Sequence, residues 1–124
     1  MQLNHQNTSQ SQSVVSKAML RAAEKLSVSN VELSQIVDIS TPRLSKISHM
    51  EAEINSSKKE FELALFFIRI YRSLDAIVGG DDKIAAKWLR NHNTALKAVP
   101  IERMKKIDGL IDVLSYLDSR RARI

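Results

Sequence analysis

The sequence predicts an all-α fold: an N-terminal helix-turn-helix module of three helices, joined by a long central helix to a small C-terminal helical domain. Apolar residues recur with helical spacing, and no window of four or more residues fits an alternating strand better. With three glycines and 44% hydrophobic residues in 124, we expect one compact unit, or two small ones that share a core. The absence of cysteine excludes a disulfide scaffold and any cysteine-based zinc site.

The N-terminal residues 1–13 are polar, and we expect them to form a disordered arm. They have neither the basic start nor the apolar stretch of a signal peptide. The longest apolar run, LALFFI at 63–68, is too short to span a bilayer. These features predict a cytoplasmic protein with no membrane partner.

Two short helices are predicted after this arm. The inward residues of the first are Val15, Met19, Ala22 and Leu26. The second opens with Ser29 and Glu32 at the spacing of a capping box, in which each side chain bonds the other residue's backbone N–H. Its inward residues are Leu33, Ile36 and Val37. Asp38 occupies the following turn, where aspartate tolerates a left-handed conformation better than most residues do.

A third helix is predicted to begin near Ser40 or Thr41, because Pro42 is tolerated only in the first turn of a helix. Its inward residues are Leu44 and Ile47. A tight turn between the last two of three short helices is the helix-turn-helix arrangement, which we assign to residues 14–56.

This segment resembles the helix-turn-helix of Xre/lambda-repressor-type regulators. The matching residues are Leu33, Ser34, Ile36, Val37, Ile39, Ser40, Leu44, Ser45, Lys46 and Ile47, whereas Asp38 stands where glycine is usual. The resemblance implies that the third helix enters the major groove of DNA. The candidate DNA-binding residues are Asn30, Thr41, Arg43, Ser45 and Lys46. Arg43 could bind a guanine edge, and Lys46 and Asn30 suit phosphates. The alternative is that these residues are simply solvated on a module that binds no DNA.

The longest helix is predicted at about residues 58–78, beginning with a second capping box formed by Ser57 and Glu60. Its middle, LALFFIRIY, is apolar on nearly every side, which a helix with one wet face would not be. We therefore expect it to lie between the N-terminal module and either the C-terminal helices or a second copy of the chain.

The C-terminal part, residues 57–124, continues with further helices. Gly79 or Gly80 ends the long helix and Asp81 or Asp82 caps the next. The expected inward residues of that next helix are Ile84, Ala85, Trp88 and Leu89. After an Asn-His-Asn bend, Pro100 is expected to start a helix, whose inward residues would be Ile101, Met104 and Ile107. Asp108 would cap a last amphipathic helix, whose inward residues would be Leu110, Val113, Leu114 and Leu117.

This C-terminal part resembles the toxin-binding domain of the Xre/MbcA/ParS antitoxin family. The matching residues are Trp88, Leu89, Asn93, Ala95, Leu96, Pro100, Gly109, Val113 and Leu117, whereas Ala122 stands where family members commonly have glycine. The resemblance implies a type II antitoxin, which is not an enzyme. Such proteins neutralise a co-encoded toxin, here a RES-domain protein that consumes NAD, and repress their own operon. We also expect a homodimer, because two half-sites about 34 Å apart require two recognition helices.

The candidate toxin-binding residues lie in the bend and in the C-terminal tail. They are Asn91, Asn93, Tyr116, Arg120, Arg121, Arg123 and Ile124. The last five residues carry three arginines and no acidic residue, a local charge of +3 within a net charge of +5. Guanidinium groups match phosphate acceptors, so the tail could compete with NAD for the entrance of the toxin. The alternative is a frayed, solvated basic end.

Enzyme activity is not expected. His5, His49 and His92 have no second histidine or carboxylate at ligand spacing, and the chain lacks a nucleophile elbow and a phosphate loop. His92 is expected to cap the C-terminus of the helix that carries Trp88. We expect no cofactor, metal or small-molecule substrate. The remaining alternative is a stand-alone dimeric DNA-binding regulator without a toxin.

Overall fold

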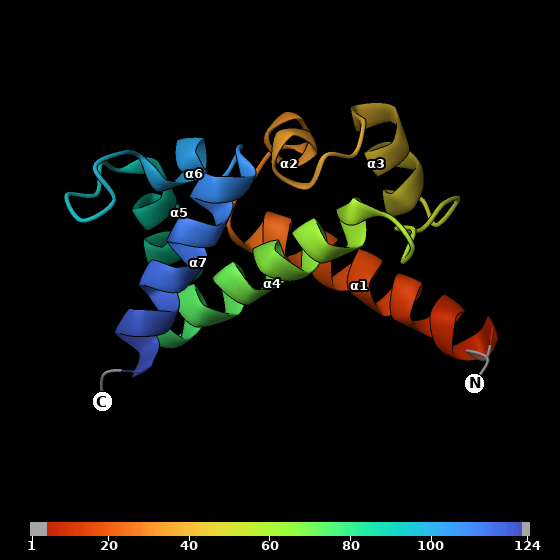
Figure 1. Cartoon of the computed structure of the whole chain (residues 1–124), viewed down its shortest axis with the longest axis horizontal. Coiled ribbons are helices and arrows are strands. Elements are labelled where there is room, and N and C mark those ends of the chain that lie inside the picture. The colour runs from red at the N-terminus through yellow and green to blue at the C-terminus, as the bar shows by residue number, and fades with distance from the viewer. Residues whose placement is uncertain (1–4, 123–124) are drawn as a thin grey trace.

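The computed structural model describes residues 5–122, which form seven helices and no strand (Figure 1). The all-α prediction is confirmed for this range. The helices are α1 (His5–Lys25), α2 (Asn30–Val37), α3 (Thr41–Ser48), α4 (Lys59–Ile77), α5 (Asp82–Arg90), α6 (Pro100–Arg103) and α7 (Ile107–Ala122). None of the helices in the described part is long and apolar enough to cross a membrane.

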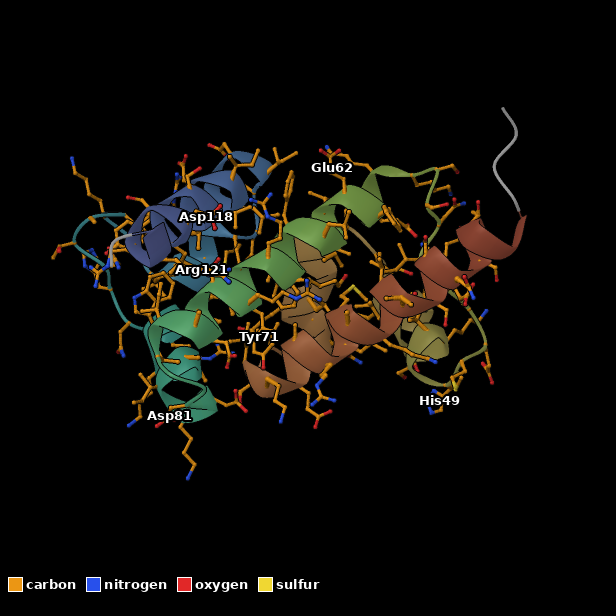
Figure 2. All side chains as sticks on the ribbon, turned by 90° about the horizontal axis from the view of Figure 1, so that it is seen from below. His49, Glu62, Tyr71, Asp81, Asp118 and Arg121 are labelled. Atoms are coloured by element: carbon orange, nitrogen blue, oxygen red, sulfur yellow. The ribbon has the colours of Figure 1, made fainter. Side chains whose placement is uncertain are left out.

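Helix α4 lies in the middle of the molecule, with α1 along one side and α7 along the other (Figure 2). Helix α2 also contacts α4, next to α3 on the upper side in Figure 1. The side chains of Phe67, Ile70 and Leu74 are buried between these neighbours. This explains why α4 is apolar on nearly every side and confirms the predicted sandwich. Its C-terminal neighbour is α7 of the same chain.

Helix α1 starts much earlier than expected. It begins at His5, so the disordered arm predicted for residues 1–13 is wrong for residues 5–13, while residues 1–4 lie outside the described part. Two polar side chains attach this segment to the loop before α4. The Gln12 Oε1 accepts the backbone N–H of Ser56 at 3.0 Å, and the Ser16 hydroxyl accepts that of Ile54 at 2.9 Å. Gln12, one of the polar residues that suggested disorder, thus binds the loop before α4, a role that only tertiary contacts reveal.

Several local predictions are confirmed by the helix ends. Ser29 and Glu32 form the capping box of α2, and the Ser40 hydroxyl accepts the N–H of Arg43 at the start of α3. Asp38 adopts the left-handed conformation, with φ 57° and ψ 46°. The Asp81 carboxylate accepts two N–H groups of the first turn of α5. Local side-chain chemistry therefore sets these four boundaries.

Other local predictions are wrong. The capping box of Ser57 and Glu60 does not form. The N-cap of α4 is Lys58, without a side-chain cap; the Ser57 hydroxyl donates to Asn55, and Glu60 is only 6% exposed. Ile84 and Ile107 are exposed rather than inward. Asp108 lies inside the first turn of α7 and not before it.

Candidate functional site

Most of the predicted DNA-binding residues are exposed on the helix-turn-helix module. Thr41, Ser45 and Lys46 are exposed on α3, and Asn30 is exposed at the first turn of α2. The two helices lie next to each other on the same side of the molecule (Figure 1). Exposed hydroxyl, amide and ammonium groups on adjoining helices are able to contact a polyanionic backbone and base edges.

Arg43 was also predicted to face outward, and this is wrong. Its guanidinium turns inward and forms a bidentate ion pair with Glu60, in which Nη2 and Oε2 are 2.5 Å apart. The same Nη2 donates to the backbone carbonyl of Glu53 at 2.9 Å. The side chain is only 32% exposed. The residue that best matched a guanine edge in the sequence is therefore engaged inside the protein.

Glu60 binds Arg43 and does not form the predicted capping box with Ser57. Burial by itself would raise the pKa of this carboxyl, but hydrogen bonds from Arg43 and from the backbone N–H of Asn55 outweigh burial and lower the pKa. The carboxylate thus stays charged. A glutamate three residues after a serine fits a capping box equally well, so no sequence signal separated the two roles.

The end of α3 shows two further features. The His49 ring Nδ1 lies 2.8 Å from the carbonyl oxygen of Ser45, at the C-terminus of the helix. Met50 follows with a left-handed backbone at φ 62° and a side chain that is 77% exposed. A long apolar side chain in this conformation is uncommon and costs free energy.

A second cluster joins α5 to α7. The rings of Trp88 and Tyr116 are stacked, with centroids 6.2 Å apart and planes 12° from parallel. The Arg120 guanidinium lies 5.8 Å from the centroid of the Tyr116 ring and donates to its hydroxyl at 3.2 Å. We call Trp88, Tyr116 and Arg120 the aromatic corner. Trp88 is half-buried and not a full core residue, so this corner reaches the surface.

The bend after α5 is built by the two asparagines that were predicted to bind a partner. The Asn91 side chain donates to the carbonyl of Lys87 at 2.9 Å, so Asn91, and not His92, caps the C-terminus of α5. The Asn93 Oδ1 accepts the N–H of Leu96 at 3.0 Å, and the backbones of Asn93 and Ala98 bond each other. Both asparagines therefore hold the shape of the bend, whose tip remains exposed.

The described end of α7 carries two arginines. Arg120 and Arg121 are exposed and line a surface hollow together with Ala76 and Ile77 of α4. Arg121 is labelled on α7 in Figure 2. Arg123 and Ile124 lie outside the described residues.

Gly109 has a steric reason to be glycine. A Cβ at this position would lie 1.9 Å from the carbonyl oxygen of Arg103. The backbone of the last residue of α6 therefore lies directly against the first turn of α7. Among the glycines of the chain, this one permits a close approach of two backbone segments.

A polar contact links the C-terminal helices to the helix-turn-helix module. Arg90 of α5 donates to both carboxylate oxygens of Glu32 in α2, at 2.7 and 2.8 Å, and to the carbonyl of Ser27 at 2.8 Å. The hydrogen bond from Arg90 is the largest cause that lowers the pKa of Glu32 to about 2. Glu32 thus serves both the cap of α2 and the contact between the two halves.

Within residues 5–122, no group of three or more histidine or acidic side chains lies close enough together to hold a metal ion. The fold defines a class of protein: a helix-turn-helix module whose neighbouring long helix, α4, also packs against a C-terminal group of helices. Residues 5–69 match the antitoxin Xre-like helix-turn-helix domain, and residues 73–123 match the antitoxin Xre/MbcA/ParS C-terminal toxin-binding domain.

The chain belongs to the Xre/MbcA/ParS antitoxin family, because the first of these matches alone covers more than half of it. Its two domains are those of an antitoxin that binds DNA and a toxin. Proteins with this pair of domains are typically not enzymes. No curated protein matches the chain significantly.

Proposed function

We propose that this protein is the antitoxin of a type II system that neutralises a co-encoded RES-domain toxin, which degrades NAD, and represses its own operon. In this proposal residues 14–56 bind the operator and residues 57–124 bind the toxin. The protein acts in the cytoplasm as a homodimer, so that two α3 helices read two half-sites.

The aromatic corner is the observation that best supports toxin binding. Its stacked rings hold the guanidinium of Arg120 at the surface, next to the exposed Arg121, at the C-terminal end of α7. Large aromatic side chains and arginine are the residue types enriched where protein interfaces gain most of their free energy. The bend formed by Asn91 and Asn93 adjoins α5, so we place it at the same interface.

The tail supplies the chemistry that would block the toxin. The tail sequence contains Arg120, Arg121 and Arg123, whose guanidinium groups match the phosphate acceptors of a dinucleotide site, and ends with the apolar Ile124. In the proposal this tail enters the toxin and competes with NAD. The choice of a RES-domain toxin rests on the family resemblance, and the arginines support it because NAD is a phosphate-bearing substrate.

The first test is co-expression of this chain, tagged at its N-terminus, with the neighbouring open reading frame. Stoichiometric co-purification, together with growth arrest and loss of cellular NAD when the chain is omitted, is expected. If nothing co-purifies and the neighbour is harmless alone, the toxin-binding proposal is wrong and a stand-alone dimeric regulator takes its place.

The second test concerns the tail. The double variant Arg120→Gln/Arg121→Gln and a deletion of residues 119–124 are expected to lose neutralisation. A matched double variant, Lys17→Gln/Arg21→Gln, removes the same charge from exposed residues of α1 on the far side of α4 (Figure 2) and should neutralise normally. Neutralisation that survives the deletion would exclude the tail as the blocking element.

A further inference from the structure

Helix α3 depends on its surroundings for its orientation. It has eight residues, fewer than an isolated helix needs for stability in water. Its residues Leu44 and Ile47 are buried, and α2 and α1 are its main packing neighbours. Apolar contacts of this kind have little directional preference. The angle at which α3 presents its outer face therefore needs a directional contact.

Arg43 provides such a contact to α4. Its two terminal nitrogens engage both oxygens of Glu60, and one also donates to the Glu53 carbonyl. Glu60 additionally accepts the N–H of Asn55 at 2.8 Å. The ion pair thus joins α3, the loop before α4 and the first turn of α4 in one network. A planar guanidinium bound at both ends of a carboxylate fixes orientation as well as distance.

The burial of Glu60 makes this contact hard to release. The residue is 6% exposed, and a buried carboxylate that loses its partner is strongly disfavoured. If Arg43 turned outward to a base or phosphate, it would leave that charge without its arginine. The residues free to contact DNA on α3 are instead Thr41, Ser45 and Lys46, which are exposed.

We propose that Arg43 is a positioning residue for operator binding: its bidentate pair with Glu60 sets the orientation of α3, while Thr41, Ser45 and Lys46 contact the DNA. This inference rests on the proposed operator binding. It changes the role of Arg43 from reading a base to holding the helix that reads it.

The test measures the affinity of the full chain for a duplex from the promoter region of its own operon and for a scrambled duplex, over a series of salt concentrations. The variants are Arg43→Lys, Glu60→Gln and, as a phosphate-contact control, Lys46→Gln. We expect Arg43→Lys and Glu60→Gln to bind the promoter at least about tenfold more weakly, with little change on the scrambled duplex. The slope of log affinity against log salt should stay unchanged for both and fall by about one for Lys46→Gln.

Glu60→Gln is the most informative variant, because the two possible roles of Arg43 predict opposite signs. It removes a negative charge and frees Arg43, so a base- or phosphate-contacting Arg43 would bind DNA equally well or more tightly. A positioning role predicts weaker promoter binding. The exchange Arg43→Glu/Glu60→Arg restores the pair in reverse and should recover most of the affinity lost by Arg43→Glu alone.

Folding of each variant is checked by circular dichroism and urea unfolding. If Glu60→Gln fails to fold, the exchange Arg43→Glu/Glu60→Arg decides the question, because a DNA-contacting Arg43 would leave it as weak as Arg43→Glu. Promoter binding by the exchange variant that is no tighter than that of Arg43→Glu, or undiminished promoter binding in Glu60→Gln, would overturn the positioning role. Those outcomes leave operator binding by the wild type intact. A wild type that does not prefer its promoter over the scrambled duplex would refute operator binding itself.

Discussion

Glu32→Gln should destabilise the protein at neutral pH by removing the ion pair between its two halves. Glu32 accepts the N–H of Ser29 at 3.0 Å and two hydrogen bonds from Arg90 of α5. Glutamine keeps an oxygen that can accept the Ser29 N–H, since glutamine also serves in capping boxes. The substitution therefore removes the charge and leaves the cap of α2 in place.

The magnitude follows from the pKa of Glu32, which falls from 4.5 to about 2, chiefly through the hydrogen bond from Arg90. At 1.36 kcal/mol per pKa unit this corresponds to about 3 kcal/mol as an upper limit. The Arg90 side chain is 43% exposed, so solvent screens the pair. We therefore expect a loss of about 1–2 kcal/mol in the free energy of unfolding.

The pH dependence has a definite sign. In the unfolded chain Glu32 takes up its proton near pH 4.5, while in the folded protein its pKa is about 2. Between these values the unfolded state binds more protons, so the stability from this pair is complete above pH 4.5 and is lost as the pH falls toward 2. The Glu32→Gln variant lacks this contribution at every pH.

The assay is urea unfolding followed by circular dichroism at pH 7, 4 and 3, at one fixed protein concentration. The control is Glu62→Gln, which neutralises an exposed carboxylate of α4 (Figure 2). The difference between wild type and Glu32→Gln should narrow from pH 7 to pH 3, whereas the control stays close to wild type. Equal stability at pH 7, or a gap that does not narrow at pH 3, would refute the reasoning.

Three further substitutions test local features by thermal or urea unfolding. Gly109→Ala should lower the free energy of unfolding by at least about 2 kcal/mol, because the new Cβ would lie 1.9 Å from the Arg103 carbonyl oxygen. The control, Ser115→Ala on the exposed side of α7, should leave the free energy of unfolding nearly unchanged. Met50→Gly should stabilise the protein by about 0.5–1 kcal/mol, because it relieves a left-handed backbone at φ 62°. Tyr116→Ala should lower the free energy of unfolding by about 1–2 kcal/mol, because the stacked ring is lost. The fluorescence emission of Trp88, the single tryptophan, should shift to longer wavelength, because its indole becomes more exposed to water.

Each of these expectations has an outcome that contradicts it. A Gly109→Ala variant as stable as wild type would mean that the two backbones separate at little cost. Met50→Gly should also be more stable than Met50→Ala, and the reverse order would exclude backbone strain. Unchanged tryptophan emission in Tyr116→Ala would show that the stack does not shield the indole in solution.

The exposed residues of α3 could largely be predicted from the sequence. For the aromatic corner the sequence supplied Tyr116 and Arg120 as candidates but not their contact with Trp88. Helical spacing and a proline placed α3, and its exposed residues Thr41, Ser45 and Lys46 follow from that placement. The stack of Trp88 on Tyr116 joins residues 28 positions apart on different helices, and periodicity contains no information about which helices meet.

The sequence by itself determined the features that depend on residues close together along the chain. The cap at Ser29, the left-handed turn at Asp38 and the inward face of α2 depend on hydrogen bonds and sterics within a few residues. The family was also within reach, because its motifs are local spacings of apolar residues, proline and glycine.

Only the tertiary structure decided which partner is bound by each polar side chain that has several possible hydrogen-bond or ion-pair partners. Glu60 could cap α4 or pair with an arginine, and Arg43 could face DNA or a carboxylate. Gln12 could lie in a solvated arm or bind the loop before α4. Each alternative is locally acceptable, and the choice depends on which distant group the folded chain brings within hydrogen-bonding distance.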